Sequence, residues 1–393
     1  MKRSILFIQP SMGIGGVEKA LLSLVNVLVD KYDVYLMLIT PSGEFMKYLP
    51  EGVKLIECPF KKEILNIPDK GLASIIRTYI ADKRIFSLIR LFFSIALMKF
   101  FGCDKMLGKA LFNRVDLKFD CICNFPGPNH YTSILAEHIC KSEKKFIWIH
   151  NEFKSARKSA ANFKKRYEKY DKIFAVSESC RDEFVELLPE LTEKTEVLYN
   201  ITDPKLYYKM ASDKESFNDG YQGVRILSVG RLSYQKGFDI AAEISNELRN
   251  EGYSFRWYII GRGEEEEHLN SLITKYQLQD CFCLLGAKDN PYPYFRDCDL
   301  YVQPSRFEGY GLTVAEAKAF HKPVVCTDFA GAFEQITDGK NGFIVSCEKE
   351  TIKNAVKKLL DDNEIAKSFS RELKETSVSN IEEVNRFEQF IKE

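Results

Sequence analysis

The fold prediction starts from the stretch YVQPSRFEGYGLTVAEA, residues 301–317. Its apolar start predicts a short β-strand, and the glycines at 309 and 311 predict a turn, after which Leu312 opens a helical pattern. Strands and helices that alternate in this way are typical of a parallel sheet with crossover helices. Free backbone N–H groups at the start of such a helix can hydrogen-bond an anion. The stretch therefore indicates both a fold class and an anion site.

Two carboxylates flank this predicted anion site. Glu308 lies in the turn, and Glu316 lies about one turn into the helix. Each carboxylate can accept hydrogen bonds from hydroxyl groups, one from a sugar and one from a ribose. We therefore expect an anion site and a polyol site next to each other.

Short apolar runs bounded by turn residues recur throughout the chain, and amphipathic stretches such as residues 17–29 lie between them. The first series comprises residues 5–9, 32–39, 121–124, 146–150 and 173–177, and the second comprises residues 226–229, 256–260, 282–285, 300–303, 323–326 and 342–345. Continuous apolar strands that alternate with helices indicate parallel sheets covered on both faces. The prediction is an α/β protein built from two doubly wound units.

The length and one turn-rich stretch predict where these units divide. A chain of 393 residues exceeds what one core usually supports. Turn residues at 199–204 follow a short strand-like run, which places a break there. We predict an amino-terminal domain of residues 1–198 and a carboxyl-terminal domain of residues 199–375. The final helix, residues 376–393, is expected to pack back on the first domain.

Charge is distributed unevenly although the net charge is zero. Residues 1–170 hold 28 Lys and Arg against 16 Asp and Glu, whereas residues 171–393 hold 28 against 40. This asymmetry predicts a basic face on the front half, whose target could be a lipid headgroup, a phosphate or a nucleic acid.

Residues 83–118 combine eight basic and two acidic residues with many Phe, Leu and Ile. Arg90 and Lys99 interrupt the apolar run and argue against a helix that spans a bilayer. The composition suits a helix that lies in the interface of an anionic membrane. The alternative is a core helix that covers the sheet with its lysines in solvent.

The cysteines and the amino terminus predict a cytoplasmic protein. The eleven cysteines include no C-x-x-C pair, which favours buried free thiols in a reducing compartment over a zinc site or a disulfide framework. The apolar run after Met1-Lys2-Arg3 is too short for a signal peptide and ends at a glycine loop.

That first glycine loop contains Gly15 and Gly16 at the predicted start of a helix, where a phosphate or a sugar could approach the backbone. It fails the dinucleotide fingerprint G-x-G-x-x-G because its third position is Glu18. Gly261-Arg262-Gly263 fails in the same way, with Glu266 at the third position. Both failures argue against an NAD-dependent dehydrogenase, and a plain turn remains the alternative for each loop.

A second loop, Gly230-Arg231 through Lys236-Gly237, follows the strand predicted at residues 226–229. Ligands of open α/β sheets bind at the carboxyl ends of strands, so its two cations could neutralise a diphosphate. The alternative is a solvated loop whose cations pair with nearby carboxylates.

Asp297-Cys298-Asp299 has the Asp-x-Asp spacing of some divalent metal sites. It precedes the strand predicted at residues 300–303 and therefore lies away from the carboxyl ends of the strands. A turn or a helix cap explains it better, and we predict no metal site.

Together these motifs resemble the retaining glycosyltransferases of the GT-B fold, in which two Rossmann-like domains face each other across a cleft. The large family marked by a Glu, seven residues and a second Glu, glycosyltransferase family 4, is matched by Glu308 and Glu316. The glycine loops at residues 15–18, 230–237 and 261–263 are also similar to that family. Tyr310 departs from it, since Phe is common there.

The resemblance implies a role for each motif residue. Arg231 and Lys236, with Gly230, would hold the donor diphosphate, Glu316 the ribose, and Glu308 the hydroxyl groups of the transferred sugar. Backbone groups around the donor would come from Gly15, Gly16, Gly309, Tyr310, Gly311, Leu312 and Thr313. His150, at the end of the strand predicted at residues 146–150, resembles the family histidine beside the sugar, and a structural histidine is the alternative.

The implied function is transfer of a sugar from a nucleotide-diphosphate sugar, expected to be a UDP-sugar, with retention of configuration and without a metal or other cofactor. The implied acceptor is a polyprenyl-diphosphate-linked glycan in cell-surface or capsular polysaccharide biosynthesis. The enzyme would then be peripheral on the inner face of the plasma membrane, held through residues 83–118, with no nucleic-acid partner. Alternatives are a transferase with a soluble acceptor, a nucleotide-sugar epimerase of the same fold, or a catalytically silent nucleotide-binding protein.

Overall fold

The computed structural model describes residues 2–58, 80, 89, 117–128, 132–133, 135–150, 164–212, 216–376 and 379–392. The segment predicted to contact a membrane, residues 83–118, lies outside the described residues except for Ile89, Leu117 and Lys118. Within the described part of the chain, no helix combines the length and the hydropathy that crossing a bilayer requires.

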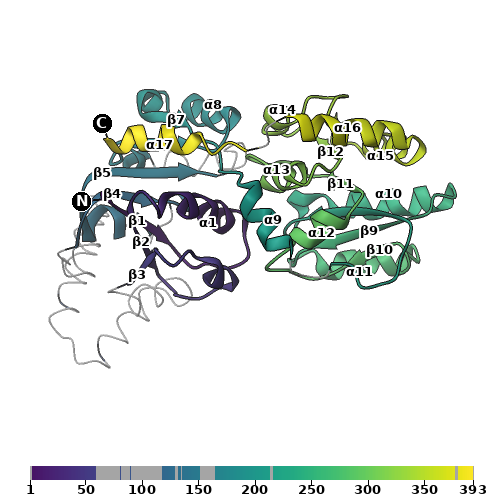
Figure 1. The fold of residues 1–393 in the computed structure, drawn as a ribbon, viewed down its shortest axis with the longest axis horizontal. Helices are drawn as coiled ribbons and strands as arrows, with labels where there is room; N and C mark the ends of the chain where they lie inside the picture. The colour runs from purple at the N-terminus through teal and green to yellow at the C-terminus, as the bar shows by residue number, and fades with distance from the viewer. Residues whose placement is uncertain are drawn as a thin grey trace.

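Two parallel sheets form the framework of the described chain (Figure 1). The first has the order β3-β2-β1-β4-β5-β6-β7 and the second β10-β9-β8-β11-β12-β13, with every neighbouring pair parallel. The strands are β1 (Ser4–Gln9), β2 (Asp33–Leu38), β3 (Lys54–Glu57), β4 (Leu117–Asn124), β5 (Cys140–Ile149), β6 (Lys172–Ala175), β7 (Thr195–Val197), β8 (Val224–Val229), β9 (Phe255–Ile260), β10 (Phe282–Leu284), β11 (Leu300–Gln303), β12 (Val324–Thr327) and β13 (Gly342–Val345). The predicted α/β class with two doubly wound units is confirmed.

Helices cover both faces of each sheet. They are α1 (Gly16–Leu28), α8 (Glu178–Leu187), α9 (Pro204–Ser212), α10 (Phe238–Asn250), α11 (Glu266–Lys275), α12 (Tyr292–Asp297), α13 (Leu312–Ala319), α14 (Ala332–Gln335), α15 (Lys349–Asp361), α16 (Asn363–Glu375) and α17 (Glu383–Lys392). Four single-turn elements are η1 (Glu44–Tyr48), η2 (Leu135–Ile139), η3 (Pro189–Lys194) and η4 (Tyr234–Lys236). We call the unit on the first sheet, with α17, the first domain, and the unit on the second sheet, with α9, the second domain.

Strand β1 shows why the sheets are covered on both faces. Its side chains alternate, so that Ile5 and Phe7 join the core under α1 and α17 whereas Leu6 and Ile8 join the core on the opposite face. Strand β8 does the same in the second domain, where Ile226 and Leu227 belong to different cores. Both faces of a strand must therefore be apolar, which produces the continuous apolar runs of the sequence.

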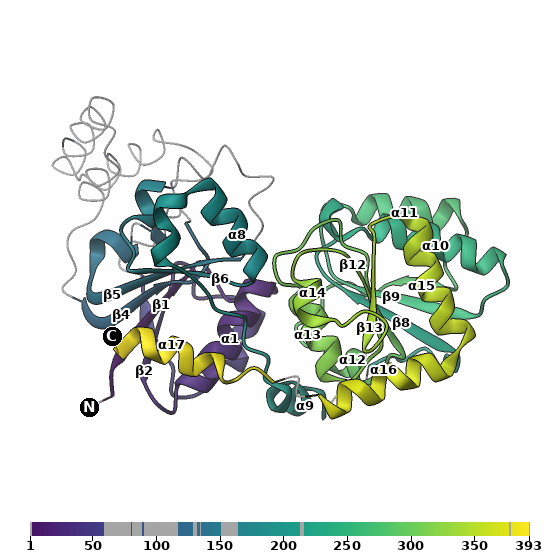
Figure 2. The ribbon, with the colours of Figure 1, turned by 90° about the horizontal axis from the view of Figure 1, so that it is seen from above.

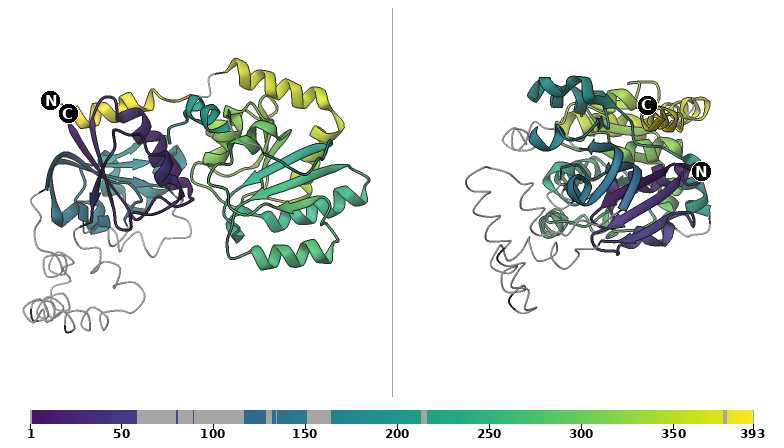
Figure 3. Two further views of the ribbon diagram at one scale, coloured as in Figure 1. Left: turned by 60° about the horizontal axis from the view of Figure 1, so that its bottom comes forward. Right: turned by 90° about the vertical axis from the view of Figure 1, so that its left-hand side faces the viewer.

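The chain crosses between the domains twice, once before α9 and once before α17, as Figure 2 shows. The two crossing segments are joined by hydrogen bonds. The backbone N–H of Thr202 donates to Asn380 Oδ1 at 2.6 Å, and Asn380 Nδ2 donates to the carbonyl of Asn200 at 2.9 Å. The second crossing returns α17 to the first domain, where both chain ends lie close together (Figure 3).

Helix α17 inserts apolar side chains into the core of the first domain. Phe387 is fully buried, and its ring centroid lies 5.7 Å from that of Trp148 and 5.9 Å from that of Phe174. Aromatic pairs at this separation add to the stabilisation that burial provides.

We therefore expect Phe387→Ala to lower the free energy of unfolding by about 3–5 kcal/mol, because it leaves a cavity among the rings of Phe146, Trp148 and Phe174. Chemical denaturation followed by circular dichroism measures this change. Phe333→Ala is the matched control, since 66% of the Phe333 side chain is exposed, and it should shift the value by less than ~0.5 kcal/mol. Equal effects of the two substitutions would contradict the packing described for α17.

Candidate active site

Three loops of the second domain meet where β8, β9 and β11 end. Glycines allow two of them to touch: a Cβ atom on Gly261 would lie 1.8 Å from the carbonyl oxygen of Gly230, and one on Gly263 would lie 2.1 Å from that of Leu232. The loop after β9 thus requires glycine at 261 and 263 because the backbone of the loop after β8 lies against it. The Gly-x-Gly pair has a packing role here rather than a dinucleotide fingerprint.

Lys236, whose side chain is 16% exposed, forms an ion pair with the buried Glu308 at the meeting point of these loops. Glu308 Oε1 accepts from Lys236 Nζ, from Ser305 Oγ at 2.8 Å and from Gln303 Nε2 at 3.2 Å. Among the described residues, every hydrogen bond to Glu308 ends on Oε1. The other carboxylate oxygen, Oε2, is therefore the one available to a hydroxyl group of a substrate.

Arg231 lies on the same loop as Lys236, but its position is different. Its side chain is 76% exposed, and its Nε lies 3.6 Å from Glu264 Oε2. A pair this exposed holds the guanidinium only weakly, so the side chain can turn toward a bound anion. The structure thus brings Lys236 to Glu308 and leaves Arg231 at the surface of the same loop.

Helix α13 begins beside this ion pair. Its cap, Gly311, has φ = +78°, a conformation that favours glycine. Thr313 Oγ1 donates to Gln303 Oε1 at 3.0 Å, and Gln335 Nε2 donates to the carbonyl of Tyr310. These bonds fix the first turn of α13, which begins at Leu312 and presents the positive end of the helix dipole.

The first domain meets the second at Gly309. A Cβ atom on Gly309 would lie 2.4 Å from the carbonyl oxygen of His150, which follows β5. Ser177 Oγ, before α8, donates to the carbonyl of Gly309 at 3.0 Å. The backbone of His150 is thus next to the residue that follows Glu308. The role beside the sugar that we expect for its side chain stays a prediction.

The imidazole of His150 is neutral at pH 7. Burial lowers its pKa to about 4, despite a hydrogen bond of 2.7 Å between Nε2 and the carbonyl oxygen of Phe125. A carbonyl only accepts, so Nε2 carries the proton and Nδ1 is an acceptor.

On the first domain, Gly15 and Gly16 open α1 as predicted. A Cβ atom on Gly15 would lie 2.2 Å from Glu18 Oε2, whereas one on Gly16 would meet no atom within 4 Å. Glu18 accepts from Gln9 Nε2 at 3.1 Å, and burial raises the pKa of its carboxyl group. Only the second of these glycines has free space beside it.

Glu316 is fully buried in α13. Its Oε1 contacts Lys19 Nζ of α1 at 2.6 Å and accepts from the hydroxyl of Tyr292 at 3.0 Å. Lys19 and Tyr292 had no role in the sequence analysis. Little in the sequence sets Lys19 apart, because the same face of α1 also carries the polar Ser23 and Asn26.

Gln303 and Ser305 are also site residues that the sequence analysis did not single out. Both are buried, and both bind Glu308. Their signal was polarity at the end of an apolar strand, where the carboxyl ends of parallel strands bind ligands.

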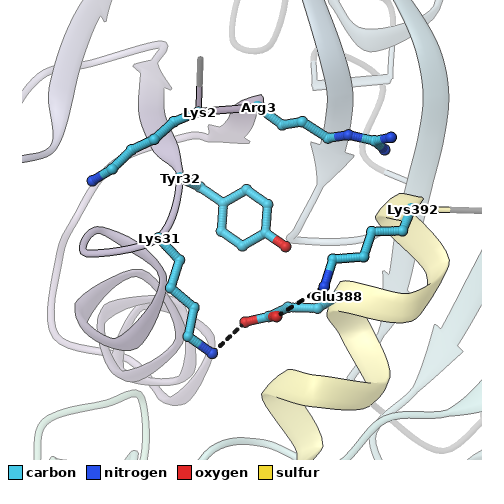
Figure 4. A pocket seen from close by; sticks show the side chains of 6 residues that line it. All are labelled: Lys2, Arg3, Lys31, Tyr32, Glu388 and Lys392. Atoms are coloured by element: carbon cyan, nitrogen blue, oxygen red, sulfur yellow. Dashed lines mark hydrogen bonds and ion pairs between the residues drawn. The ribbon is translucent and has the colours of Figure 1, made fainter.

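A hollow lies elsewhere on the first domain. It encloses about 500 Å³ and is lined by Lys2, Arg3, Lys31, Tyr32, Glu388 and Lys392 (Figure 4). Lys2 and Arg3 precede β1, so this hollow lies at the amino ends of the strands, whereas the site above lies at their carboxyl ends. Open α/β sheets bind their ligands at the carboxyl ends of the strands, so the candidate active site is the one around Lys236 and Glu308.

The Asp-x-Asp motif has local partners. Asp297 pairs with Arg296 and accepts from Ser216 Oγ at 2.6 Å, and Asp299 accepts from the backbone N–H of Arg225 at 2.8 Å. In the described part of the chain, no three His, Cys, Asp or Glu side chains cluster in a way that could hold a metal ion.

The fold and this site define a class of protein. Crystal structures of HepE from Anabaena, one with UDP and glucose, and of TarM from S. aureus superpose on the whole chain with TM-scores of 0.68 and 0.71, at 16% and 13% identity. Each comparison covers at least 99% of both chains. The chain has the GT-B fold.

Residues 212–376 match the family model described as "Glycosyl transferases group 1". A relative from Campylobacter jejuni, an N-acetylgalactosamine-N,N'-diacetylbacillosaminyl-diphospho-undecaprenol 4-alpha-N-acetylgalactosaminyltransferase, is 29% identical over 210 residues, 53% of this chain and 56% of that protein. The amylovoran biosynthesis glycosyltransferase AmsK of Erwinia amylovora is 33% identical over 149 residues, 35% and 37% of the two chains. The chain thus spans about half the length of the first relative and less of the second.

We expect the neutral state of His150 to show in the pH dependence of stability. Its pKa is about 4 when folded and ~6.5 when unfolded, so between these values only the unfolded chain binds the proton. The free energy of unfolding therefore falls as the pH falls from ~6.5 to ~4. Relative to His150→Gln, the wild type should lose on the order of 1–3 kcal/mol over this range in urea titrations. Parallel pH curves for the two proteins would refute the assignment.

Gly309→Ala should keep the two domains apart, because its Cβ atom would overlap the carbonyl oxygen of His150. Small-angle X-ray scattering should give a larger radius of gyration than for the wild type. Gly16→Ala, at the start of α1 in the first domain, has open space around its Cβ atom and should leave the radius unchanged. A Gly309→Ala protein as compact as the wild type would contradict the contact.

Proposed function

We propose that the protein transfers a sugar from a nucleotide-diphosphate sugar to a lipid-linked glycan in the assembly of a cell-surface polysaccharide. The observation that carries this proposal is the ion pair between Lys236 and the buried Glu308 beside the start of α13, next to the His150 backbone of the first domain. A cation and a carboxylate beside a helix N-terminus, next to the first domain, support the proposal. Those are the groups that a sugar bonded to a diphosphate requires.

The chemistry follows from where charge develops. Cleavage of a sugar–phosphate bond leaves negative charge on the departing diphosphate and positive charge on the sugar ring. Lys236, Arg231 and the N–H groups at the start of α13 stabilise the diphosphate. Glu308 accepts hydrogen bonds from the sugar through Oε2, and the neutral His150 offers Nδ1 as a further acceptor.

In the proposed reaction the configuration of the sugar is retained. The acceptor hydroxyl attacks the anomeric carbon on the face from which the diphosphate leaves, and a phosphate oxygen takes its proton as the carbon–oxygen bond to the diphosphate breaks. Since no second carboxylate is needed, one buried glutamate suffices. We propose that the reaction needs no metal ion, and undiminished transfer in a chelator would agree with that.

The proposed donor is a UDP-sugar. Crystal structures of HepE contain UDP, UDP with glucose, or UDP-glucose, and HepE shares the whole fold of this chain. In this proposal Glu316 binds the ribose, and the loops at residues 230–237 and 261–263 surround the phosphates together with Gly15 and Gly16.

The proposed acceptor is a polyprenyl-diphosphate-linked glycan. The name of the Campylobacter relative specifies a diphospho-undecaprenol acceptor, and AmsK is named for amylovoran biosynthesis. A lipid-linked acceptor places the enzyme at the inner face of the membrane, where residues 83–118 would provide a basic and apolar contact. Sedimentation with anionic vesicles tests that contact.

A thermal-shift panel of UDP-, GDP- and ADP-sugars tests the donor proposal. One sugar nucleotide should raise the unfolding temperature, since a ligand that binds only the folded state stabilises it. The absence of a shift with any donor at millimolar concentration would refute the proposed function.

Lys236→Ala should lower the rate of donor hydrolysis by ~10²- to 10³-fold, since it removes a preorganised cation from the leaving diphosphate. The rate is measured as release of the nucleoside diphosphate. Lys275→Ala is the charge-matched control, because Lys275 lies in the last turn of α11, exposed and away from the site. If the two variants hydrolyse the donor equally fast, Lys236 does not bind the diphosphate.

A further inference from the structure

Lys19 reaches from α1 of the first domain to Glu316 in α13 of the second. The distance between Lys19 Nζ and Glu316 Oε1 is 2.6 Å, and the side chains are 12% and 0% exposed. Lys19 Nζ also lies 5.0 Å from the centre of the Tyr292 ring, whose hydroxyl binds the same carboxylate oxygen. The two domains are thus joined by an ion pair at Glu316, the carboxylate that binds the ribose of the donor in the proposed function.

Only one of the two carboxylate oxygens of Glu316 has hydrogen-bond donors among the described residues. Its Oε2 is buried, and none of the described residues donates a hydrogen bond to it. A buried acceptor without a donor is unfavourable, so a state that supplies one is favoured. The adjacent hydroxyl groups of a ribose offer two donors to one carboxylate.

We propose that Lys19 takes the place of the ribose on Glu316 while the donor is absent, so that this ion pair and the bound nucleotide exclude each other. The inference rests on the proposed function and adds a residue that controls the affinity for the nucleotide. Glu316 has no exposed surface, so a hydroxyl group reaches it only after Lys19 withdraws. Because Lys19 belongs to the opposite domain, its withdrawal is coupled to separation of the domains.

A second contact keeps α1 in place when Lys19 is altered. Ser23, one turn further along α1, is hydrogen-bonded to Tyr207 of α9. The Tyr207 ring stacks on that of Tyr292 at 4.6 Å between centroids. Substitution of Lys19 therefore removes the competing cation and leaves the neighbouring contact between α1 and the second domain.

The test compares UDP with 2′,3′-dideoxy-UDP by isothermal titration calorimetry; if the donor panel selects GDP or ADP, the matching pair is used. We expect Lys19→Met to bind UDP ~10-fold more tightly than the wild type, since the free oxygen of Glu316 then gains ribose donors without displacing a lysine. The affinity for the dideoxy compound should stay unchanged. The preference for ribose therefore rises by the same factor.

Further variants make the result specific. Lys31→Met removes a lysine paired with Glu388 just after α1 and should leave both affinities at wild-type values. Lys19→Arg keeps the charge and should also behave as the wild type. In a Glu316→Gln background, Lys19→Met should add no tightening. Lys19→Gln, which removes the charge but keeps the polarity, should tighten UDP binding in the same direction and provides the measurement if the methionine variant fails to fold.

Unchanged or weaker binding of UDP by Lys19→Met would overturn the proposal, as would equal tightening of both nucleotides. These results differ from failure of the proposed function itself, in which the wild type would bind no nucleoside diphosphate at all.

Discussion

The contact between two backbones, the carbonyl of His150 and the Cα of Gly309, is the constraint on which the rest of the site depends. It lies where β5 of one domain and the loop after β11 of the other come together. Because no side chain separates them, the buried Glu308, the start of α13 and the neutral imidazole of His150 share one region. A bulkier residue at 309 would move His150 away from Glu308 and α13 although each domain would still fold.

Burial close to that contact fixes the position of the Glu308 carboxylate. The Glu308 carboxylate is buried beside Lys236, and its Oε1 also accepts hydrogen bonds from Ser305 Oγ and Gln303 Nε2. Charges held in this way interact more strongly than they would in solvent. Arg231, by contrast, remains in solvent, so its electrostatic contribution depends on a ligand that draws it in. The site thus combines one fixed cation with one that adapts.

The sequence predicted the fold well because strands buried on both faces are apolar throughout, and each predicted apolar run coincides with a strand. Strand β3 escaped prediction because only two apolar residues, Leu55 and Ile56, lie between Lys54 and Glu57 at an exposed sheet edge. Motif residues at strand ends were likewise predictable, since chain order determines which loops meet at one edge. The pairing of Lys19 with Glu316 was not, because it joins residues 297 positions apart across two domains. No local pattern records such a contact.

The two chain crossings between the domains have a mechanical consequence. A single connecting segment would let one domain rotate freely about that segment. Here Asn380 ties the segment near Thr202 to the one that leads into α17, and Phe387 anchors the latter in the first domain. Two parallel tethers suppress twisting and leave bending as the easy motion. The two domains should therefore separate by bending, and the same bend in reverse brings Gly309 back to the carbonyl of His150.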